Sequence, residues 1–557
     1  MKPRLLKLFL EKGFLVDRDV LDFLSELEDE NIAKEIINKI ALTSHEKVIT
    51  KNLINENLDK MNLVFGELEP EKKKLVEKYF VNVSISVEIK KETSLEKKNS
   101  KKICREHDRG SVKILSSPVI ASQRLEVKDF VRHFRNRYNF LKQIIQQKPE
   151  LENLTSIDKI TSNRNFSVIG IVSSKQITKN RNLILEVEDL TGKAKVLINQ
   201  NKEEVFAKSK EILLDDVIGF KCSGTKDFLF VDDFFYPDIF QKEKHRFSEE
   251  AYALFISDMH VGSKNFLENN FKKFIEWLGS GEEVVKKIKY IFVVGDSIDG
   301  VGIYPGQEKD LKIKDIKEQY ARLAEFYSKI PKHINIIQCA GQHDAVRVAE
   351  PQPPIGEDFA EPLHDIENLY LVSNPSLVEI GGNIENEKTG VKVLMYHGAS
   401  MHNVINEIEE LRLSDAHSTP ARVVKHLLMR RHLAPSHGDM IYIPDSTGDP
   451  MLIREAPDIV ATGDLHKVDI DKYNGILIIS SSCWQSITDF EEKVGNKPDY
   501  CKVPLFNLKT GEIKILDFFD GESKEEKCSI IDDKKEISEV NSDINKKEIV
   551  CEMGNGK

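Results

Sequence analysis

Five short apolar runs in the second half of the chain each end at aspartate, histidine or an amide side chain. The runs begin at 252, 290, 334, 391 and 458, and they lead to Asp258-Met-His260, Asp296-Ser-Ile-Asp299, Gln342-His343-Asp344, His397-Gly and Asp464-Leu-His466. Buried sheets present sites in this way, because the strands hold the backbone while the loops that follow reach solvent. If these strands share one sheet, the polar side chains converge at its edge.

The Asp and His residues at these strand ends predict a site for divalent ions. Carboxylate and imidazole together suit manganese, iron, nickel or zinc, whereas calcium and magnesium favour oxygen alone. On an extended loop, Asp258 and His260 would point to one side and chelate one ion. Asp296 on the next strand would bridge two ions about 3.5–4 Å apart, which can clamp a phosphate, activate water and stabilise a leaving oxygen. The pattern therefore predicts phosphoester hydrolysis.

A purely structural role for these residues is the competing explanation. A single buried histidine is usually a core residue with its hydrogen bonds satisfied, and Gly-Asp pairs are common in turns. However, four of the 15 histidines of the chain lie at these strand ends. The set as a whole therefore favours a shared site.

The elements around this site predict a multidomain α+β protein. Its parts are a helical N-terminal domain (1–85), a disordered basic linker (86–120), a helix with an OB-like β-barrel (121–247), an α/β two-sheet domain with the polar strand ends (248–520), and a disordered charged tail (521–557). The first rests on apolar residues at helical spacing, and the barrel on five β-rich runs between Phe166 and Ile239. The linker and the tail hold too few apolar residues to offset the entropy of ordering.

Two of these parts have alternative explanations. The basic run of the linker also fits a DNA tether, although a solvated linker explains it more simply. OB-like barrels often bind single strands through aromatic platforms and a basic groove. Here four aspartates, Asp215, Asp216, Asp232 and Asp233, make the barrel acidic. A scaffold that docks the next domain or a partner subunit is therefore at least as good an explanation as a DNA clamp.

Composition excludes several classes of protein. The 557 residues are 40% hydrophobic and 31% charged, without an apolar run of membrane-spanning length, so no membrane association is expected. Seven scattered cysteines without a CxxC pair indicate a reducing, cytoplasmic location and no structural zinc. The net charge of −11 does not indicate nucleic-acid binding by itself. A DNA substrate would need a local basic path or a partner subunit.

The ordered motifs resemble those of the calcineurin-like metallophosphoesterases: Asp258-x-His260, Gly295-Asp296-x-x-Asp299, Gly341-Gln-His343-Asp344, His397-Gly and Gly463-Asp464-x-His466. The stretches between them resemble the small subunit of family D DNA polymerases of archaea. These stretches are Val301-Gly-Ile-Tyr-Pro-Gly-Gln, Ile316-Lys-Glu-Gln-Tyr, Asp344-Ala-Val-Arg347 with Pro351-Gln-Pro, Val372-Ser-Asn-Pro, and Leu427-Leu-Met-Arg-Arg-His-Leu-Ala-Pro. The likeness extends from about Asp129 to about Phe518 and is weak in the first hundred residues.

The resemblance implies a metal-dependent 3′ to 5′ exonuclease that removes mispaired nucleotides, in a complex whose large subunit synthesises DNA. It implies two divalent ions, manganese before magnesium, iron or zinc, and as partners the large subunit, single-stranded and primer-template DNA, and a sliding clamp. Asp258, His260, Asp296 and His466 would hold one ion, and Asp296, Gln342, His397 and Asp464 the other. His343 would protonate the departing 3′ oxygen or steady the phosphate, with Asp344 orienting its ring.

Two residues depart from the family pattern. Gln342 stands where the family has Asn, and its extra methylene moves the amide oxygen by about 1.5 Å. Asp464 stands where the family's Gly-His-x-His motif has its first His, and it adds a negative charge near the incoming phosphate. The departures leave two rivals to the nuclease: a non-catalytic scaffold that tethers the polymerase subunit, and a free-standing phosphodiesterase. The polymerase-like stretches and the barrel argue against the second.

Overall fold

The computed structural model describes residues 15–16, 20–21, 48–49, 111–119, 125–161, 165–381, 390–438, 443–445, 448–488, 491–492 and 496–519. The chain forms two compact units, 1–103 and 104–557. In the first unit, β1 (Leu15–Val16) pairs in parallel with β2 (Val48–Ile49). Most of the predicted helical domain, residues 86–110 of the predicted linker, and the predicted tail lie outside the described residues. No helix within the described ranges is long and apolar enough to cross a membrane.

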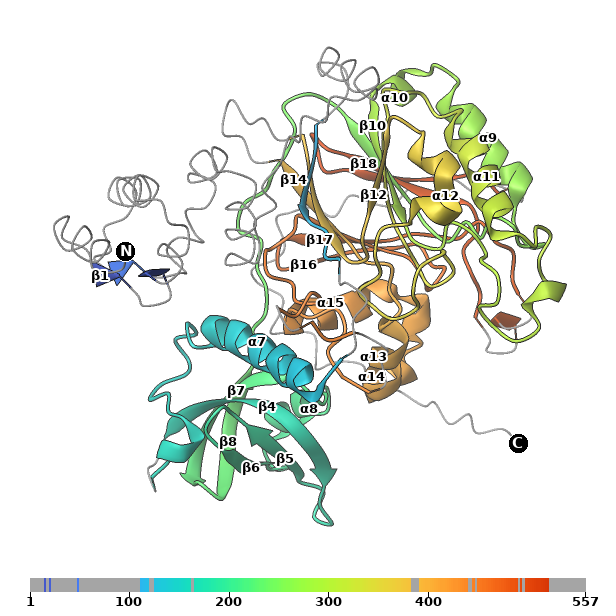
Figure 1. Ribbon diagram of the computed structural model, residues 1–557. Helices are drawn as coiled ribbons and strands as arrows, with labels where there is room; N and C mark the ends of the chain where they lie inside the picture. The colour runs from blue at the N-terminus through green and yellow to red at the C-terminus, as the bar shows by residue number, and fades with distance from the viewer. Residues whose placement is uncertain are drawn as a thin grey trace, which may run out of the picture. The chain divides into compact units, whose positions relative to one another are not determined.

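The second unit is built around two six-stranded sheets (Figure 1). One has the order β12 (Leu369–Val372), β11 (Asn335–Cys339), β10 (Ile288–Val294), β9 (Tyr252–Ile256), β18 (Lys502–Asn507), β19 (Ile513–Asp517). The other has the order β16 (Asp469–Tyr473), β17 (Ile476–Ser480), β15 (Ile459–Thr462), β14 (Val391–Met395), β13 (Ser376–Ile380), β3 (Val112–Ser116). A shared apolar core lies between them, with Phe255 stacked on Phe292 from one sheet and Met395 and Ala461 from the other.

Helices cover the outer faces of both sheets. The first sheet packs on α9 (Glu268–Leu278), α11 (Ile316–Tyr327) and α12 (Glu357–His364), and the second on α13 (Met401–Glu407), α14 (Glu409–Leu413) and α15 (Pro420–Arg430). Shorter helices are α10 (Glu283–Lys286), η2 (Gln307–Lys309) and η4 (Ala416–Ser418). Because both faces of each sheet are covered, the central strands are continuous apolar runs rather than alternating ones.

The strands that precede the polar motifs are divided between the two sheets, as the expected two-sheet domain allows, so the condition of one shared sheet is not met. β9, β10 and β11 are parallel neighbours in the first sheet. β14 and β15 are parallel neighbours in the second. The side chains still converge because the two sheets pack face to face through their common core. The mixed α/β fold is therefore as expected, while the arrangement that assembles the polar side chains differs.

The C-terminal end of the predicted linker (86–120) contains a strand. Its residues Val112–Ser116 form β3, which pairs antiparallel with β13 at the edge of the second sheet. The backbone ladder accounts for this strand better than burial does, because Ile114 is 44% exposed. Edge strands need little apolar burial of their own when a neighbouring strand supplies the hydrogen bonds.

A five-stranded closed barrel precedes the two sheets. It has the order β4 (Phe166–Ile177), β5 (Leu183–Glu188), β6 (Lys193–Ile198), β8 (Phe228–Phe235), β7 (Val217–Thr225), with α8 (Glu203–Ser209) after β6 and η1 (Ile157–Lys159) before β4. Each predicted β-rich run forms one strand. α7 (Val127–Ile145) is the predicted amphipathic helix, and Tyr138 on it donates a hydrogen bond to the Ile169 carbonyl at 3.0 Å. Gly219 leaves room for this packing, since a Cβ there would lie 2.7 Å from the Ile145 side chain.

Buried ion pairs join the barrel and its helix to the second sheet's helical layer. Arg430 at the end of α15 donates to Asp216 in the barrel at 2.9 Å, with both side chains buried. Arg137 on α7 donates to Asp449 at 2.7 Å, which also contacts His432. Because burying a charge is costly unless it is paired, these contacts hold the barrel in one orientation.

Replacing Arg430 with alanine should destabilise the protein strongly, because the Asp216 carboxylate would stay buried without its cation. Breaking a buried pair in this way typically costs about 3–5 kcal/mol. Arg422→Ala is the matched control, because Arg422 lies on the same helix and pairs with Glu410 while the two side chains are 38% and 55% exposed. Its loss should cost at most about 1 kcal/mol. Urea unfolding measures both, and equal losses would contradict the anchoring role of Arg430.

Candidate metal centre

Three groups of Asp and His residues that could hold an ion lie at the meeting edge of the two sheets, with all ligand atoms of a group within 4.8 Å of one another. Two groups are fully buried: Asp258, His260 and His466 form one, and Asp258, Asp296 and His397 form the other. The third consists of His260, Asp299 and the half-buried His343. Asp258 and Asp296 follow strands of the first sheet, and His397 and His466 follow strands of the second. The structure thus brings together the residues that the sequence placed on five separate strand ends.

The sequence analysis expected an extended loop at Asp258-x-His260. In the structure, the loops that carry these side chains are not extended. Asp258 and His260 both have φ 49°, Asp296 has φ 47°, Asp464 has φ 66° and His466 has φ 56°. Left-handed backbone is uncommon for residues other than glycine and gathers at functional sites. Each strand turns sharply at its end in this way, so that Asp258 and His260 still reach one group.

Each imidazole of the two buried groups has an oxygen atom near its Nδ1 atom, and its Nε2 atom faces the carboxylates. His397 Nδ1 lies 2.8 Å from the Val294 carbonyl, and His466 Nδ1 lies 2.8 Å from Glu491 Oε1. His260 Nδ1 lies 3.3 Å from Asp299 Oδ1, without the angle of a hydrogen bond. The Nε2 atoms lie close to each other and to the aspartates: His260 to His466 at 3.4 Å, His466 to Asp258 at 3.4 Å, and His397 to Asp296 at 3.2 Å. Histidines that bind a metal through one ring nitrogen usually have a hydrogen-bond acceptor next to the other ring nitrogen.

Several buried side-chain atoms of the residues at this centre lack a hydrogen-bond partner. They are Asp258 Oδ1, His260 Nδ1, Gln342 Oε1, His397 Nε2 and Asp464 Oδ2. Buried polar atoms are normally satisfied, so a cluster of unsatisfied donor atoms is the expected trace of ligands for an ion. Carboxylate, amide and imidazole donors together fit divalent ions. The residues present are therefore suited to hold such ions.

Asp258 is common to the two buried groups, and Asp296 belongs to one of them. Its Oδ1 atom lies 3.4 Å from His466 Nε2 and 4.0 Å from His397 Nε2. One oxygen of Asp296 accepts from the His343 backbone N–H at 2.8 Å, and the other faces His397. The strand-end pattern could not rank the two aspartates, because their separation from each histidine depends on how the sheets pack.

Both departures from the family pattern lie at this centre. Gln342 lies on the loop between Gly341 and His343, and its Oε1 atom is buried without a hydrogen-bond partner. Asp464 Oδ1 lies 3.7 Å from His397 Nε2, and Asp464 Oδ2 lies 3.0 Å from Nε2 of His402, a residue that the sequence analysis did not consider. The backbone N–H of Asp464 donates to Asp258 Oδ2 at 3.0 Å. Position 464 therefore remains part of the cluster with a carboxylate in place of an imidazole.

Asp344 does not orient the His343 ring, contrary to the expectation. The His343 Nδ1 atom lies 2.8 Å from the backbone carbonyl of Asp299. The Asp344 carboxylate accepts from the Gly341 N–H at 2.9 Å and the Ser297 hydroxyl at 2.5 Å. Adjacent residues on this tight loop point in different directions, so Asp344 shapes the loop while Asp299 holds the ring.

The charges of the cluster perturb one another strongly. Burial raises the pKa of Asp296, but the neighbouring imidazoles of His397 and His343 outweigh burial and bring the pKa below its usual value. Burial lowers the pKa of His397, but Asp296 and Asp258 outweigh it and raise that pKa well above the usual value. Burial also opposes ionisation of Asp464, yet His402 and His397 lower its pKa to about 2. The carboxylates of Asp296 and Asp464 are therefore ionised within the cluster.

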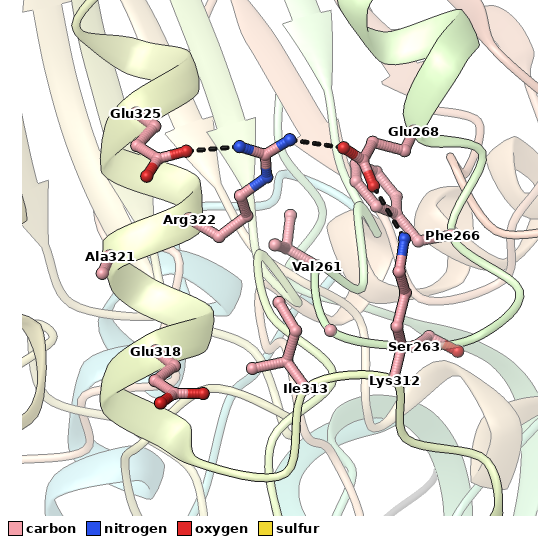
Figure 2. A pocket seen from close by; sticks show the side chains of 11 residues that line it. Val261, Ser263, Phe266, Glu268, Lys312, Ile313, Glu318, Ala321, Arg322 and Glu325 are labelled. Carbon is pink, nitrogen blue, oxygen red and sulfur yellow. Dashed lines mark hydrogen bonds and ion pairs between the residues drawn. The ribbon is translucent and has the colours of Figure 1, made fainter.

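A separate cavity of about 460 Å³ begins where the Asp258 loop ends, at Val261 and Ser263 (Figure 2). Figure 2 shows Arg322 between Glu268 and Glu325, while Lys312 also reaches Glu268. The cationic side chains of this cavity are thus bound to carboxylates of its own wall. The Asp and His cluster is the better candidate for chemistry.

A comparison with protein families relates the middle of the two-sheet body to a class of DNA polymerase subunits. A family model that describes the B subunits of DNA polymerases alpha and epsilon matches residues 253–469, a range that contains every residue of the cluster named above except Glu491. The part of the two-sheet body within residues 253–469 is therefore similar to the B subunits of these DNA polymerases.

Relatives over a longer part of the chain identify the family. The chain is 36% identical to the DNA polymerase II small subunit of Methanothermobacter thermautotrophicus over 402 residues, which cover 71% of this chain and 80% of the relative. It is 36% identical over 405 residues to that of Pyrococcus furiosus and 37% over 397 residues to that of Methanocaldococcus jannaschii, covering 70% and 69% of this chain. The chain spans a little under two thirds of these last two, 64% and 65%. The chain belongs to the family of archaeal DNA polymerase II small subunits, family D.

Three residues that support the cluster were missed or left without a role by the sequence analysis. Asp299 was part of a motif but had no function assigned, and Glu491 and His402 lie in no motif. The acidic and imidazole character of these residues was visible, but their partners His260, His466 and Asp464 are 39, 25 and 62 residues away. Only the folded chain brings them together.

Glu350 lies behind the cluster and is 1% exposed. It accepts a hydrogen bond from the Tyr396 hydroxyl at 3.2 Å, next to His397. Burial raises its pKa from 4.5 to about 8, and Asp464 adds to this while Tyr396 opposes it. The folded protein therefore keeps a proton that the unfolded chain releases. The stabilisation from this proton is complete below about pH 4.5 and is lost as the pH rises towards 8.

The free energy of unfolding of the metal-free wild type should fall between pH 5 and pH 8. In Glu350→Gln this fall should be smaller, because the amide stays neutral throughout. The measurement is urea unfolding in the presence of a chelator at several pH values across this range. Glu361→Gln is the control, since Glu361 is exposed on α12. Parallel stability curves for the wild type and Glu350→Gln would contradict the raised pKa of Glu350.

Proposed function

We propose that this chain is the small subunit of a heteromeric DNA polymerase and that its two-sheet body is a calcineurin-like metallophosphoesterase domain with 3′ to 5′ exonuclease activity. The substrate would be single-stranded DNA and the mispaired 3′ end of primer-template DNA. Membership of the family supports the polymerase part of the proposal. The observation that carries the nuclease part is the set of three imidazoles whose Nε2 atoms face buried carboxylates.

The proposed ligands divide into two positions. Asp258, His260, Asp296 and His466 would hold one ion, and Asp296, Gln342, His397 and Asp464 the other. When bound, divalent ions in such pairs attract phosphate oxygens, lower the pKa of water and stabilise a leaving oxygen. Asp299 and Glu491 would hold the rings of His260 and His466 in the ligating orientation, because a held Nδ1 leaves Nε2 as the donor atom.

His343 is the proposed proton donor to the departing 3′ oxygen. A carbonyl oxygen can only accept, so the contact with the Asp299 carbonyl requires a proton on His343 Nδ1. The Nε2 atom is then the one that carries or releases a proton towards the substrate. The Asp344 carboxylate would act indirectly, by holding Gly341 and Ser297 so that the loop keeps His343 beside Asp296.

The barrel and the charge of the chain would contribute to the complex with the large polymerase subunit. The net charge of −11 means that much of the attraction for DNA has to come from the large polymerase subunit. The barrel, which is proposed to be OB-like, would act as a scaffold for that subunit. Contact with a sliding clamp remains a prediction from the family resemblance.

A non-catalytic scaffold is the second candidate function, and Gln342 and Asp464 favour it because both alter a proposed ligand. The retained set of Asp258, His260, Asp296, His343, His397 and His466 favours the nuclease.

Asp296→Asn should reduce degradation of single-stranded DNA by more than about 100-fold, beyond the 10–100-fold loss that is typical for an outer-shell residue. The amide removes a negative charge from the second ion position. The assay is release of nucleotides from a labelled 3′ end by the complex of this chain with its large subunit. Asp365→Asn, at an exposed aspartate on the end of α12, is the matched control. Full activity of a folded Asp296→Asn protein would place the nuclease elsewhere.

Removal of metal by a chelator should abolish the nuclease, and manganese or magnesium should restore more activity than zinc. The reason is that carboxylate and amide oxygens at Asp464 and Gln342 favour harder ions than an imidazole does. The same 3′-end assay, run on chelated complex with each ion added back, measures the preference. Best recovery with zinc would contradict the assignment of the second ion position.

A further inference from the structure

His402 and Asp464 form an ion pair at the edge of the metal centre. His402 Nε2 lies 3.0 Å from Asp464 Oδ2, while Asp464 Oδ1 lies 3.7 Å from His397 Nε2. One oxygen of the carboxylate therefore faces His402 and the other faces the proposed ligands. His402 is 44% exposed, whereas Asp464 is 8% exposed, so His402 lies on the outer side of the pair.

The loops that carry this pair are packed against each other. Gly398 has φ 131°, and a Cβ there would lie 3.2 Å from Asp464 Cβ and 2.4 Å from the Met401 side chain. The Gly463 N–H donates to the His397 carbonyl at 2.8 Å, and the Met401 N–H donates to the Gly398 carbonyl at 2.8 Å. Met401, the neighbour of His402, is fully buried. The start of α13 is thus held beside Asp464 by backbone contacts, which keep the backbone of His402 close to that carboxylate.

In this pair the carboxylate faces the centre and the imidazole lies behind it, which is the opposite of the arrangement at the three proposed histidine ligands. At His260, His397 and His466 an oxygen lies behind an imidazole, and the imidazole faces the centre. At position 464 an imidazole lies behind a carboxylate, and the carboxylate faces the centre. A residue in the outer position orients the ligand in front of it and tunes its donor strength.

We propose that His402 is a positioning residue that holds Asp464 with one oxygen directed at the second ion position, and that this reversed pair makes the position select manganese or magnesium over zinc. The inference rests on the proposed two-ion centre and deepens it. The His402 imidazole lies at ion-pair distance from Oδ2, so Oδ1 is the oxygen that faces the ion position. A single carboxylate oxygen is a harder donor than the imidazole it replaces. His402 itself does not touch substrate or ion in this arrangement.

The test is a manganese titration of the full-length, metal-free chain by calorimetry and electron paramagnetic resonance. We expect the wild type to bind two ions. His402→Ala should weaken the second ion by about 10–100-fold and leave the first unchanged, as for loss of an outer-shell partner. His402→Gln should recover part of the affinity, because its amide nitrogen can still donate to Asp464. His417→Ala is the matched control, since the His417 ring lies 5.4 Å from that of His402 at the same rim; it should behave as the wild type.

The reversed arrangement supplies a second measurement. In the double variant His402→Asp with Asp464→His, a carboxylate would hold an imidazole ligand, and zinc should displace manganese from the second position at a lower concentration than in the wild type. Thermal unfolding checks that each variant is folded. Binding of both manganese ions by folded His402→Ala as tightly as by the wild type would overturn the proposal, as would fewer than two ions in the wild type or an unchanged zinc preference in the double variant.

Degradation of single-stranded DNA by the complex is measured in parallel and separates the two proposals. Expected manganese binding without any nuclease in the wild type would support the His402 pair and overturn the exonuclease. Nuclease activity in the wild type, together with unaltered ion binding in His402→Ala, would support the exonuclease and overturn the proposed role of His402.

Discussion

The close approach of two sheets at one edge is the constraint on which the rest of the structure depends. Their shared core brings the loops after β9, β10 and β11 against those after β14 and β15. The approach is so tight that a Cβ at Gly463 would lie 2.8 Å from both Val294 O and Asp258 Oδ2. A Cβ at Gly295 would lie 2.3 Å from His397 Nδ1. Glycine at these two positions lets ligands from different sheets occupy one cluster.

Burial then determines the electrostatics of that cluster. Aspartates removed from water are costly unless cations or donors compensate, and here each faces an imidazole or a backbone N–H. Asp258 accepts from Asp464 N and Asp296 accepts from His343 N, so the carboxylates are held by the loops that they join. The same rule operates at the barrel, where Asp216 and Asp449 are buried against Arg430 and Arg137. One physical principle thus shapes both the candidate site and the connection between domains.

The departures at Gln342 and Asp464 gain a structural context from this arrangement. Both positions keep a side-chain oxygen, since the Gln342 amide oxygen is buried without a hydrogen-bond partner and the Asp464 carboxylate lies beside His397 and His402. A site losing its function would be expected to lose charged and buried ligands without replacement. Here one ligand type has been exchanged for another, together with a suitable partner. This supports a retuned metal centre within a polymerase small subunit.

The sequence by itself determined the local elements and the kind of chemistry. The five strands before Asp258, Asp296, Gln342, His397 and Asp464 were predictable from apolar runs, and the five barrel strands from alternation, because burial pattern is a property of neighbouring residues. The order of the motifs was enough to suggest the family that the comparisons then identified.

Only the tertiary structure decided how these elements share their side chains. The division of the strands between two sheets, the central place of Asp258, the use of the Asp299 carbonyl rather than Asp344 for the His343 ring, and the partners Glu491 and His402 all depend on contacts between distant segments. β3 likewise became a strand through pairing with β13, more than 250 residues later. Such contacts leave no periodic signal in the chain, because a side chain finds its partner only after sheet packing has set the distances between loops.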